Sequence, residues 1–408
     1  MPERKKMGKR SRLEIRWKAL FYVYLSMLAY SFLFQVIPPV LGLLVSSLDI
    51  SHAQAGALMS VFALPGLLIS IPGGLLTDAH GPRKVSLAAL AVAAAGSLTV
   101  ALGGSYPLLI AGRIITGFGA GVIAVVTSQT ISRWFAQKEL GSAMGIYNTA
   151  MPIGTIIALN IFGRIAAVSN WRLPVILTAG YALFVLLLFY FKHPGLPAEE
   201  KPHDEQSAAP VVQKDSLADT VSAVWPAALI WMLFNASAIS YLTFGSEYFI
   251  SAGYEPGYAG FLTSLFMIGS FIFSPLVGYL TDRVGRDEYF IIGGSIALAL
   301  LLLLVPRFDL NPLLLGGAIG LGAAFVPAPV FSLVPKIISP RQLGLGFGIM
   351  STCLNVGILV GPFLVGLSFD RTLNYLSGFN LMALFSLAAA AIALLFSLTY
   401  RRRPREQP

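Results

Sequence analysis

Twelve long apolar runs constrain this chain more than any other feature of its sequence. A helix needs roughly 20 apolar residues to cross the ~30 Å hydrocarbon layer of a bilayer. The runs cover approximately residues 18–46, 52–78, 84–104, 106–134, 140–166, 171–192, 223–250, 255–281, 287–306, 311–336, 341–368 and 373–399. Charged residues make up only 12% of the 408 residues, whereas soluble domains carry about 25%. The sequence therefore predicts an all-α polytopic membrane protein with twelve transmembrane helices.

Lysine and arginine are distributed unevenly between the two sides of the predicted protein. Of the 28, 23 lie in the two tails and in the loops after even-numbered runs, four lie in the other loops, and Arg113 lies inside a run. Because cytoplasmic segments carry the excess of positive charge, both termini are predicted to be cytoplasmic, at the plasma (inner) membrane. The net charge of +9 thus follows from topology, and no polar domain is present to bind nucleic acid.

A polar segment near the middle of the chain divides the runs into two groups of six. It contains HPGLPAEEKPHDEQSAAP, a composition typical of a flexible linker. The predicted organisation is a basic cytoplasmic tail (1–17), a six-helix bundle (18–192), a cytoplasmic linker (193–222), a second six-helix bundle (223–399) and a basic cytoplasmic tail (400–408).

The two predicted bundles share an internal repeat and are therefore pseudo-symmetric. Gly74, Asp78 and Gly81 recur 204 residues later as Gly278, Asp282 and Gly285. The fifth and eleventh runs also match, at an offset of 203, through residues that recur as Gly344, Gly348, Thr352, Gly357 and Gly366. Parallel repeats of this kind place a binding site between the halves, near the bilayer midplane.

The stretch GGLLTDAHGPRKV, from Gly73 to Val85, lies between the second and third runs. Gly81 permits a tight turn, and Pro82 suits the first turn of the next helix. Asp78 can accept hydrogen bonds from amides at a helix start, where the helix dipole favours negative charge. One such loop could simply follow the positive-inside rule, but its recurrence in the second half argues against that interpretation.

The pattern G-x-x-x-D-x-x-G-x-R-K resembles the loop signature of the major facilitator superfamily, and the span number, half repeat, linker and orientation also fit. The resemblance implies the fold of that family and secondary transport by alternating access, with a rocker-switch movement about a central cavity. It implies a cytoplasmic gate formed by Gly74, Asp78, Gly81, Arg83 and Lys84, with a weaker copy at Gly278, Asp282, Gly285 and Arg286. Ala79, Pro82 and Asp287 depart from the pattern, so the first copy is expected to dominate.

The segment GRIITGFGAG, from Gly112 to Gly121, resembles the fourth-span motif of the same family. Small residues let neighbouring helices approach closely, and this role is predicted for Gly117, Gly119, Gly121, Gly357, Gly361 and Pro362. Arg113 needs a partner or a cavity because an unpaired charge in the bilayer costs at least ~2.5–3.5 kcal/mol. Two interpretations remain open: contact with an anion or a coupling proton, and hydrogen bonding to backbone carbonyls of the first span.

Polar side chains within the runs are candidates for lining a substrate cavity. They are Tyr30, Gln35, Asn148, Asn235, Tyr241 and Asn355. Each could instead bond a neighbouring helix. Glu247, near the end of the seventh run, is either a solvated end charge or a proton acceptor and external gate contact.

Other classes of protein fit the sequence less well. The four histidines lie at run ends or in the linker, and no hydrolase or protease motif accompanies them, so no enzyme is predicted. Cys353 is the one cysteine, and neither a metal site nor a cofactor is expected. A channel would show a ring of like charges, and a receptor or sensor would carry a larger soluble domain than the linker can supply.

The sequence thus favours a transporter of a small solute, acting as a symporter or antiporter. A small organic or inorganic anion is the preferred substrate, because buried carboxylates are scarce and Arg113 is available. A proton-coupled exporter of apolar or amphiphilic compounds is the alternative. The expected partners are the substrate, a coupling proton or counter-ion and membrane lipid, with the protein acting as a monomer.

Overall fold

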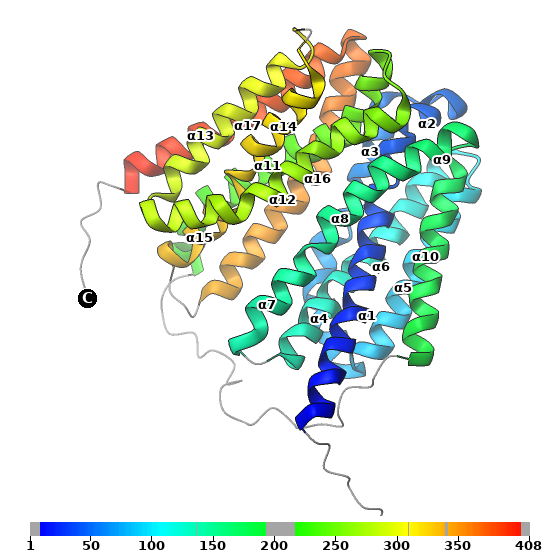
Figure 1. Ribbon diagram of the computed structural model, residues 1–408, viewed down its shortest axis with the longest axis vertical. Helices are drawn as coiled ribbons and strands as arrows, with labels where there is room; N and C mark the ends of the chain where they lie inside the picture. The colour runs from blue at the N-terminus through cyan, green and yellow to red at the C-terminus, as the bar shows by residue number, and fades with distance from the viewer. Residues whose placement is uncertain (1–8, 136, 193–216, 309, 339–341, 401–408) are drawn as a thin grey trace, which may run out of the picture.

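The computed structural model describes residues 9–135, 137–192, 217–308, 310–338 and 342–400. Over these ranges the chain is helical and forms no β-strand, which confirms the predicted all-α class. Two groups of helices lie side by side, one coloured blue to green and the other yellow-green to red (Figure 1).

Each group corresponds to one half of the chain. The first bundle contains α1 (Lys9–Gln35), η1 (Pro38–Val40), α2 (Leu41–Leu48), α3 (His52–Ser60), α4 (Gly66–His80), α5 (Pro82–Leu102), α6 (Tyr106–Trp134), α7 (Gln137–Asn148), α8 (Ala150–Ile157), η2 (Ala158–Phe162), α9 (Gly163–Val168) and α10 (Arg172–Lys192). The second contains α11 (Leu217–Ser251), α12 (Pro256–Val284), α13 (Asp287–Leu304), α14 (Pro312–Ala324), α15 (Pro327–Ile337), α16 (Leu343–Thr372) and α17 (Tyr375–Tyr400). The predicted linker, 193–222, lies mostly outside the described residues, as do parts of both predicted tails, and α11 already begins at Leu217.

The two bundles repeat the same helix pairings, in agreement with the repeat in the sequence. In the first bundle, α5 packs against α6 and α10, α1 against α8, and α4 against α6. In the second bundle, α13 packs against α14 and α17, α11 against α16, and α12 against α14. Small residues allow these contacts: a Cβ atom on Gly119 would overlap the carbonyl oxygen of Ala89, and one on Gly361 would overlap that of Ala236.

Several spans are interrupted rather than continuous. The first helix stops at Gln35, and the span resumes as η1 and α2 from Pro38, which has no amide hydrogen to donate. The second span, predicted as one run over 52–78, consists of α3 and α4 with a turn around Pro65. The tenth span is similarly divided into α14 and α15. At the breaks of the first two spans, the carbonyl oxygens of Leu33, Phe34 and Leu58 accept from a side chain of the fourth span.

Eleven stretches among the described residues are long and apolar enough to cross a membrane. The second span is not one of them, because neither α3 nor α4 alone has sufficient length. Together α3 and α4 complete the predicted twelve spans. The fold is therefore that of a multi-pass membrane protein, as the composition predicted.

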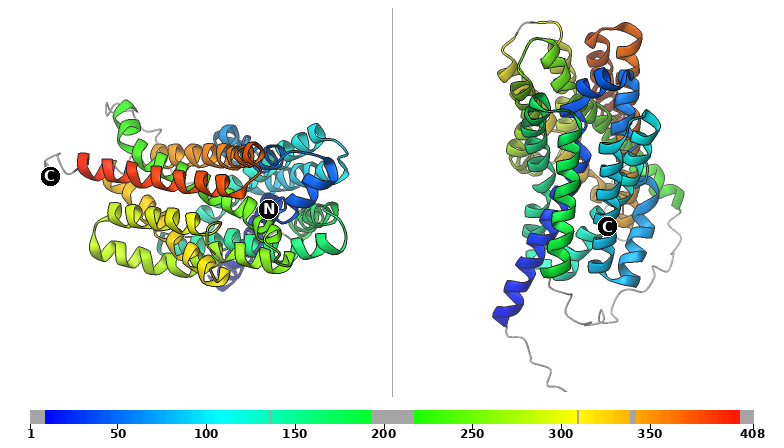
Figure 2. Two further views of the ribbon diagram at one scale, coloured as in Figure 1. Left: turned by 90° about the horizontal axis from the view of Figure 1, so that it is seen from above. Right: turned by 90° about the vertical axis from the view of Figure 1, so that its right-hand side faces the viewer.

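The two ends of the bundles differ in how closely the bundles approach. We call the end where α1 begins and α10 ends the terminal side, and the end with the connections at 49–51, 103–105, 169–171 and 252–255 the distal side (Figures 1 and 2). On the distal side, α3 packs along α16, and α8 and η2 pack along α12. The main contacts between the bundles are thus made by distal elements.

Candidate functional site

Arg113 is buried in the first bundle, with 1% of its surface exposed. Its Nη1 donates to the carbonyl oxygen of Leu33 at 2.6 Å, its Nη2 to that of Phe34 at 3.3 Å and its Nε to that of Leu58 at 2.8 Å. The guanidinium also lies 4.7 Å from the ring centre of Phe62. Backbone oxygens and an aromatic face therefore surround this charge.

The carbonyl groups that Arg113 contacts are available because two helices end there. Leu33 and Phe34 belong to the last turn of α1, which Pro38 prevents from continuing. Leu58 lies in the last turn of α3, where the backbone changes to shorter turns such as Ala63 N to Ser60 O. Unpaired carbonyls at a helix C-terminus carry partial negative charge and favour a cation. The contacts agree with the second interpretation of Arg113, a cation that bonds backbone carbonyls.

Tyr30 is the one predicted cavity residue that joins the Arg113 site. Its ring stacks on Phe34 with a centroid separation of 6.2 Å and meets Phe62 edge-on at 5.8 Å. Both phenylalanines also contact Arg113. Tyr30 and Phe34 of the first span, Phe62 of the second and Arg113 of the fourth therefore form one cluster, which we call the Arg113 cluster.

The remaining polar candidates are not gathered into one site in this conformation. Gln35 donates to the hydroxyl of Thr155 at 3.2 Å, and Asn235 donates to the carbonyl of Trp231 at 2.8 Å. Asn355 donates to the carbonyl of Ser351 at 2.9 Å. Tyr241 is buried among aromatic rings of the second bundle, and Asn148 is exposed at the end of α7.

The first copy of the predicted gate motif lies at the terminal side, between α4 and α5. Gly81 adopts a φ of 80°, which favours glycine, and Pro82 begins α5. Arg83 donates to the carbonyl oxygen of Tyr190 in α10 at 2.5 Å, and Lys84 is exposed. The side chain of Asp78 lies outside the described part. The hydrogen bond of Arg83 thus holds α5 to α10 within the first bundle.

The second copy of the motif uses a carboxylate that the motif itself does not contain. Gly285 ends α12 with a φ of 69°, and Arg286 donates to the hydroxyl of Tyr289 at 2.8 Å. Asp282 is exposed, whereas Asp287 is buried and pairs with Lys336 of α15 at 2.5 Å. The hydroxyl of Ser332 donates to Asp287 at 2.6 Å. In this bundle the buried carboxylate of Asp287 connects the motif to the tenth span.

A charged cluster joins the two bundles on the distal side. His52 begins α3, and its Nε2 lies 3.1 Å from Glu247 of α11 while its Nδ1 lies 3.2 Å from Asp370 of α16. Asp370 also accepts the backbone amides of His52 at 2.8 Å and Ala53 at 2.7 Å. The α3 N-terminus of one bundle is thus capped by a carboxylate of the other. We call His52, Glu247 and Asp370 the distal triad.

Close backbone contacts surround the distal triad. A Cβ atom on Gly56 would overlap the carbonyl oxygen of Pro362, and one on Gly366 would overlap that of His52. Across the other seam, a Cβ on Gly260 would overlap the carbonyl oxygen of Leu159. The two seams pair the second span with the eleventh and the fifth with the eighth, so they are related by the repeat.

The seam at Gly260 coincides with a short π-helix, η2, in the fifth span. Asn160 of this element donates to the hydroxyl of Ser264 in α12 at 3.0 Å. Single π-helical turns occur frequently at functional sites because they redirect side chains and backbone. The π-turn therefore brings Asn160 against the second bundle.

Sequence reasoning identified Glu247 but missed its two partners. His52 is the first residue of the second predicted run, and Asp370 follows the long, glycine-rich eleventh run. The three residues are separated by at least 123 positions along the chain. The one signal in the sequence is that each is a titratable residue at the end of a span. Residues in such positions are equally often solvated.

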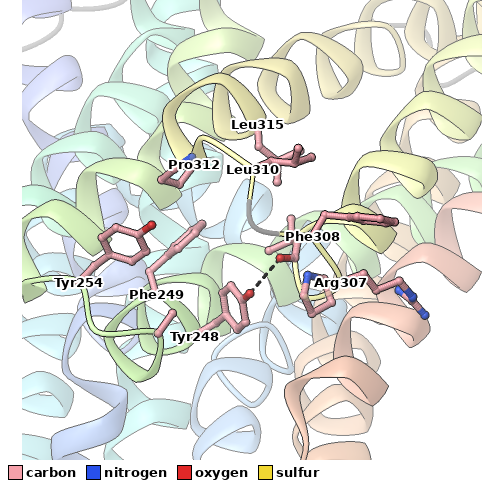
Figure 3. Close-up of a pocket in the computed structure, with 11 residues that line it drawn as sticks. Tyr248, Phe249, Tyr254, Arg307, Phe308, Leu310, Pro312 and Leu315 are labelled. Carbon is pink, nitrogen blue, oxygen red and sulfur yellow. Dashed lines mark hydrogen bonds between the residues drawn. The ribbon is translucent and has the colours of Figure 1, made fainter.

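One cavity, of about 290 Å³, opens within the second bundle on the distal side. Figure 3 shows the rings of Tyr248, Phe249 and Tyr254 on one side and Phe308 on the other. The hydroxyl of Tyr248 donates to the carbonyl oxygen of Val305 at 2.9 Å. Arg307 points away and contacts Asn380 at 2.5 Å. This cavity belongs to one bundle and is separate from the predicted central cavity.

Two pseudo-symmetric bundles of six spans, meeting across paired seams, define a class of polytopic membrane proteins. The sequence profile of the Major Facilitator Superfamily matches residues 23–254 and 246–408. The chain therefore belongs to the Major Facilitator Superfamily, and the resemblance predicted from the loop motif is confirmed.

Curated relatives in this family are named as transporters. The chain is 23% identical to the lysosomal dipeptide transporter MFSD1 of Danio rerio, over 86% of this chain and 79% of the relative. It is 28% identical to the nitrite extrusion protein of Bacillus subtilis (strain 168), over 88% of each. It is 23% identical to the hexuronate transporter of the same organism, over 82% of this chain and 83% of the relative.

Solved structures share the fold. A bacterial homologue of the human lysosomal transporter Spinster, in an inward-facing and unoccupied conformation, superposes with a TM-score of 0.79. The superposition covers 97% of this chain and 99% of the homologue at 14% identity. At this identity the likeness concerns the fold.

Proposed function

We propose that this protein is a secondary transporter that moves a small solute by alternating access between its two bundles. The observation that carries the proposal is the arrangement of the two distal seams. Four spans from opposite bundles meet there through glycine-mediated backbone contacts, at Gly56, Gly366 and Gly260. Contacts of this kind can separate as rigid surfaces, because little side-chain interdigitation has to be undone.

The proposed orientation places the terminal side in the cytoplasm. The excess of lysine and arginine on that side supports this assignment by the positive-inside rule. The distal side then faces outward across the plasma (inner) membrane, and the structure corresponds to an inward-facing state. In this scheme residues 18–192 and 223–399 move as the two bundles, the intervening segment connects them in the cytoplasm, and the protein acts as a monomer in contact with lipid.

A small anion is the proposed substrate class. Nitrite and hexuronate, which relatives are named as transporting, are anions, and a dipeptide carries a carboxylate. The chain has 28 basic against 19 acidic residues, and the Arg113 cluster places a cation of the fourth span against the first two spans. Because Arg113 is already bonded to carbonyls, its proposed contribution is a positive potential that attracts an anion rather than a direct contact.

Uptake into proteoliposomes tests this function. Purified protein would be reconstituted, and the entry of nitrite, glucuronate, a dipeptide and a cationic amphiphile would be measured against protein-free vesicles. Uptake of at least one anion, competed by the unlabelled compound, is expected. Transport restricted to the amphiphile would overturn the anion assignment and favour an exporter of amphiphilic compounds.

A matched pair of glycine variants tests alternating access in the same vesicles. Gly260→Val places a branched side chain against the carbonyl of Leu159, whereas Gly317→Val adds one where no atom lies within 4 Å of a new Cβ. Uptake is expected to be lost in Gly260→Val and kept in Gly317→Val. Equal uptake by the two variants would contradict distal closure as a step of transport.

A further inference from the structure

The distal triad consists of three titratable side chains shared between the bundles. His52 comes from the first bundle, and Glu247 and Asp370 come from the second. The centre of the His52 ring also lies 4.0 Å from the ring centre of Phe369, which covers one face of the imidazole. The triad is largely shielded from solvent, with side-chain exposures of 16%, 11% and 23% for His52, Glu247 and Asp370.

The two ring nitrogens of His52 each face a carboxylate oxygen. A neutral imidazole has one N–H donor and one lone pair, so it can donate to only one of these oxygens. The second contact then needs a proton, either on the ring or on the facing carboxyl group. In both cases the closed triad holds one proton more than a neutral histidine beside two ionised carboxylates.

Glu247 depends on this proton more than Asp370 does. Asp370 is compensated by two backbone amides at the start of α3, where the helix dipole also favours negative charge. The Oε1 of Glu247 lies against His52, and its Oε2 is buried without a hydrogen-bond partner among the described residues. Loss of the proton would leave a shielded carboxylate facing a lone pair, which is unfavourable in a site of low polarity.

Other titratable groups lie near the triad in space or along the chain. The hydroxyl of Tyr106 in α6 donates to the carbonyl oxygen of Gln54, two residues after His52. Tyr375 of α17 packs against Phe369, with the two ring centres 4.5 Å apart. Asp49 before α3 and Arg371 after Asp370 are both exposed. Within the described ranges, no group of three or more His, Cys, Asp or Glu side chains is suited to a metal ion.

We infer that the distal triad is a proton-binding gate, in which uptake of one proton from the distal side accompanies closure of the bundles. The inference rests on the proposed alternating access and adds the coupling ion and its binding site. When the bundles separate on the distal side, His52 leaves both carboxylates, and each group regains water. The open gate therefore has no need of the shared proton, and the closed gate does.

Linkage gives the size and direction of the effect. If closure takes up one proton, the ratio of closed to open protein rises up to about tenfold for each unit of decreasing pH. The rise stops once the triad is fully protonated in both conformations. Acid on the distal side thus favours the inward-facing state, and alkali favours distal opening.

The gate can be followed without any substrate by double electron–electron resonance. Spin labels at Val168→Cys in the first bundle and Phe308→Cys in the second, on a Cys353→Ser background, report the distal separation. Both label sites are exposed, at 89% and 57%. In nanodiscs between pH 5.5 and 8.5, the long-distance population of the otherwise unaltered protein is expected to grow with pH, by up to about tenfold per unit.

Two variants separate the proton gate from a purely structural contact. Glu247→Gln removes the carboxylate that requires the proton while retaining a hydrogen-bonding side chain, so the gate should stay closed up to pH 8.5. His52→Gln removes the proton-binding ring and leaves Glu247 without its cation, so the open population should be high at every pH. If the triad were only a structural contact, both variants would increase the open population. Neither variant would then alter how that population depends on pH.

His80→Gln is the matched control, because His80 is an exposed histidine at the terminal end of α4. It is expected to keep the pH response of the unaltered protein. A distal distance that does not change with pH in the unaltered protein, or a response that survives in Glu247→Gln, overturns the inference. Because no substrate is present, failure of the proton gate is distinguishable from failure of anion uptake in proteoliposomes.

Discussion

The Nε of Arg113 donates to the carbonyl oxygen of Leu58 over 2.8 Å, at the point where the second span is interrupted. The same guanidinium holds Leu33 at the end of α1. One side chain on the fourth span therefore satisfies carbonyls that two neighbouring spans leave free. The breaks and the arginine require each other, since neither free carbonyls nor a buried charge is tolerated alone in the membrane.

Arg113→Ala is expected to destabilise the protein by about 2–4 kcal/mol, because three carbonyls lose a charged donor. Arg113→Lys should recover only part of the lost stability. The charge is kept, but an ammonium cannot reach carbonyls on two helices at once as a planar guanidinium does. Thermal unfolding in detergent, followed by tryptophan fluorescence, measures both changes. Lys84→Ala, at an exposed site, is the control. An unchanged midpoint for Arg113→Ala would mean that water satisfies these carbonyls.

Asp287→Asn is expected to cost about 1–3 kcal/mol, because Asp287 is buried between Lys336 and the hydroxyl of Ser332. Asp282→Asn is the matched control within the same motif copy, and it should change the free energy of unfolding by less than about 0.5 kcal/mol, since Asp282 is exposed. Denaturation in a mild detergent compares the two. A larger effect at Asp282 would show that the motif carboxylate has a partner in another conformation.

Gly260→Val is expected to shift the protein towards distal opening, because the new side chain would overlap the carbonyl oxygen of Leu159. The labels at Val168 and Phe308 should then show a longer distance at pH 6, where the unaltered protein is closed. Gly317→Val, at an open position, should leave the distance unchanged. If Gly260→Val stays closed, the π-helix η2, which packs against α12, must shift to make room for the new side chain.

Glu247→Gln is expected to flatten the pH dependence of uptake. In the unaltered protein, closure gains a proton, so acid on the distal side should accelerate entry of an anion and alkali should slow it. The variant lacks the carboxylate that requires the proton, and its rate should vary little between pH 5.5 and 8. Initial uptake rates at fixed internal pH test this, with His80→Gln as the control. A profile parallel to that of the unaltered protein would place coupling elsewhere.

The number of spans, the two halves and the repeat could be predicted from local composition. Twenty apolar residues must form a helix in a bilayer, because no water is present to bond free backbone groups. Gly117, Gly119, Gly357 and Gly361 were likewise predictable as packing positions, and the structure places backbone carbonyls of neighbouring spans against them. The single run predicted over 52–78 is broken into α3 and α4 in the structure. The break was not predictable, because hydropathy does not depend on whether a span is one helix or two.

The partners of individual side chains could not be predicted in the same way. The alternatives for Arg113 stayed open because its acceptors, Leu33 and Leu58, are backbone atoms that any sequence would provide. Asp287 looked like a departure from the motif, although Lys336 makes it the buried anchor of that bundle.

The sequence by itself determined that this chain crosses the membrane as two related bundles with an uneven distribution of charge, because hydropathy and charge are summed along the chain. Only the tertiary structure decided that His52, Glu247 and Asp370 meet. A hydrogen bond depends on separations of about 3 Å, and the packing of α3 against α11 and α16, set by glycines on both bundles, brings residues from three distant spans to that distance.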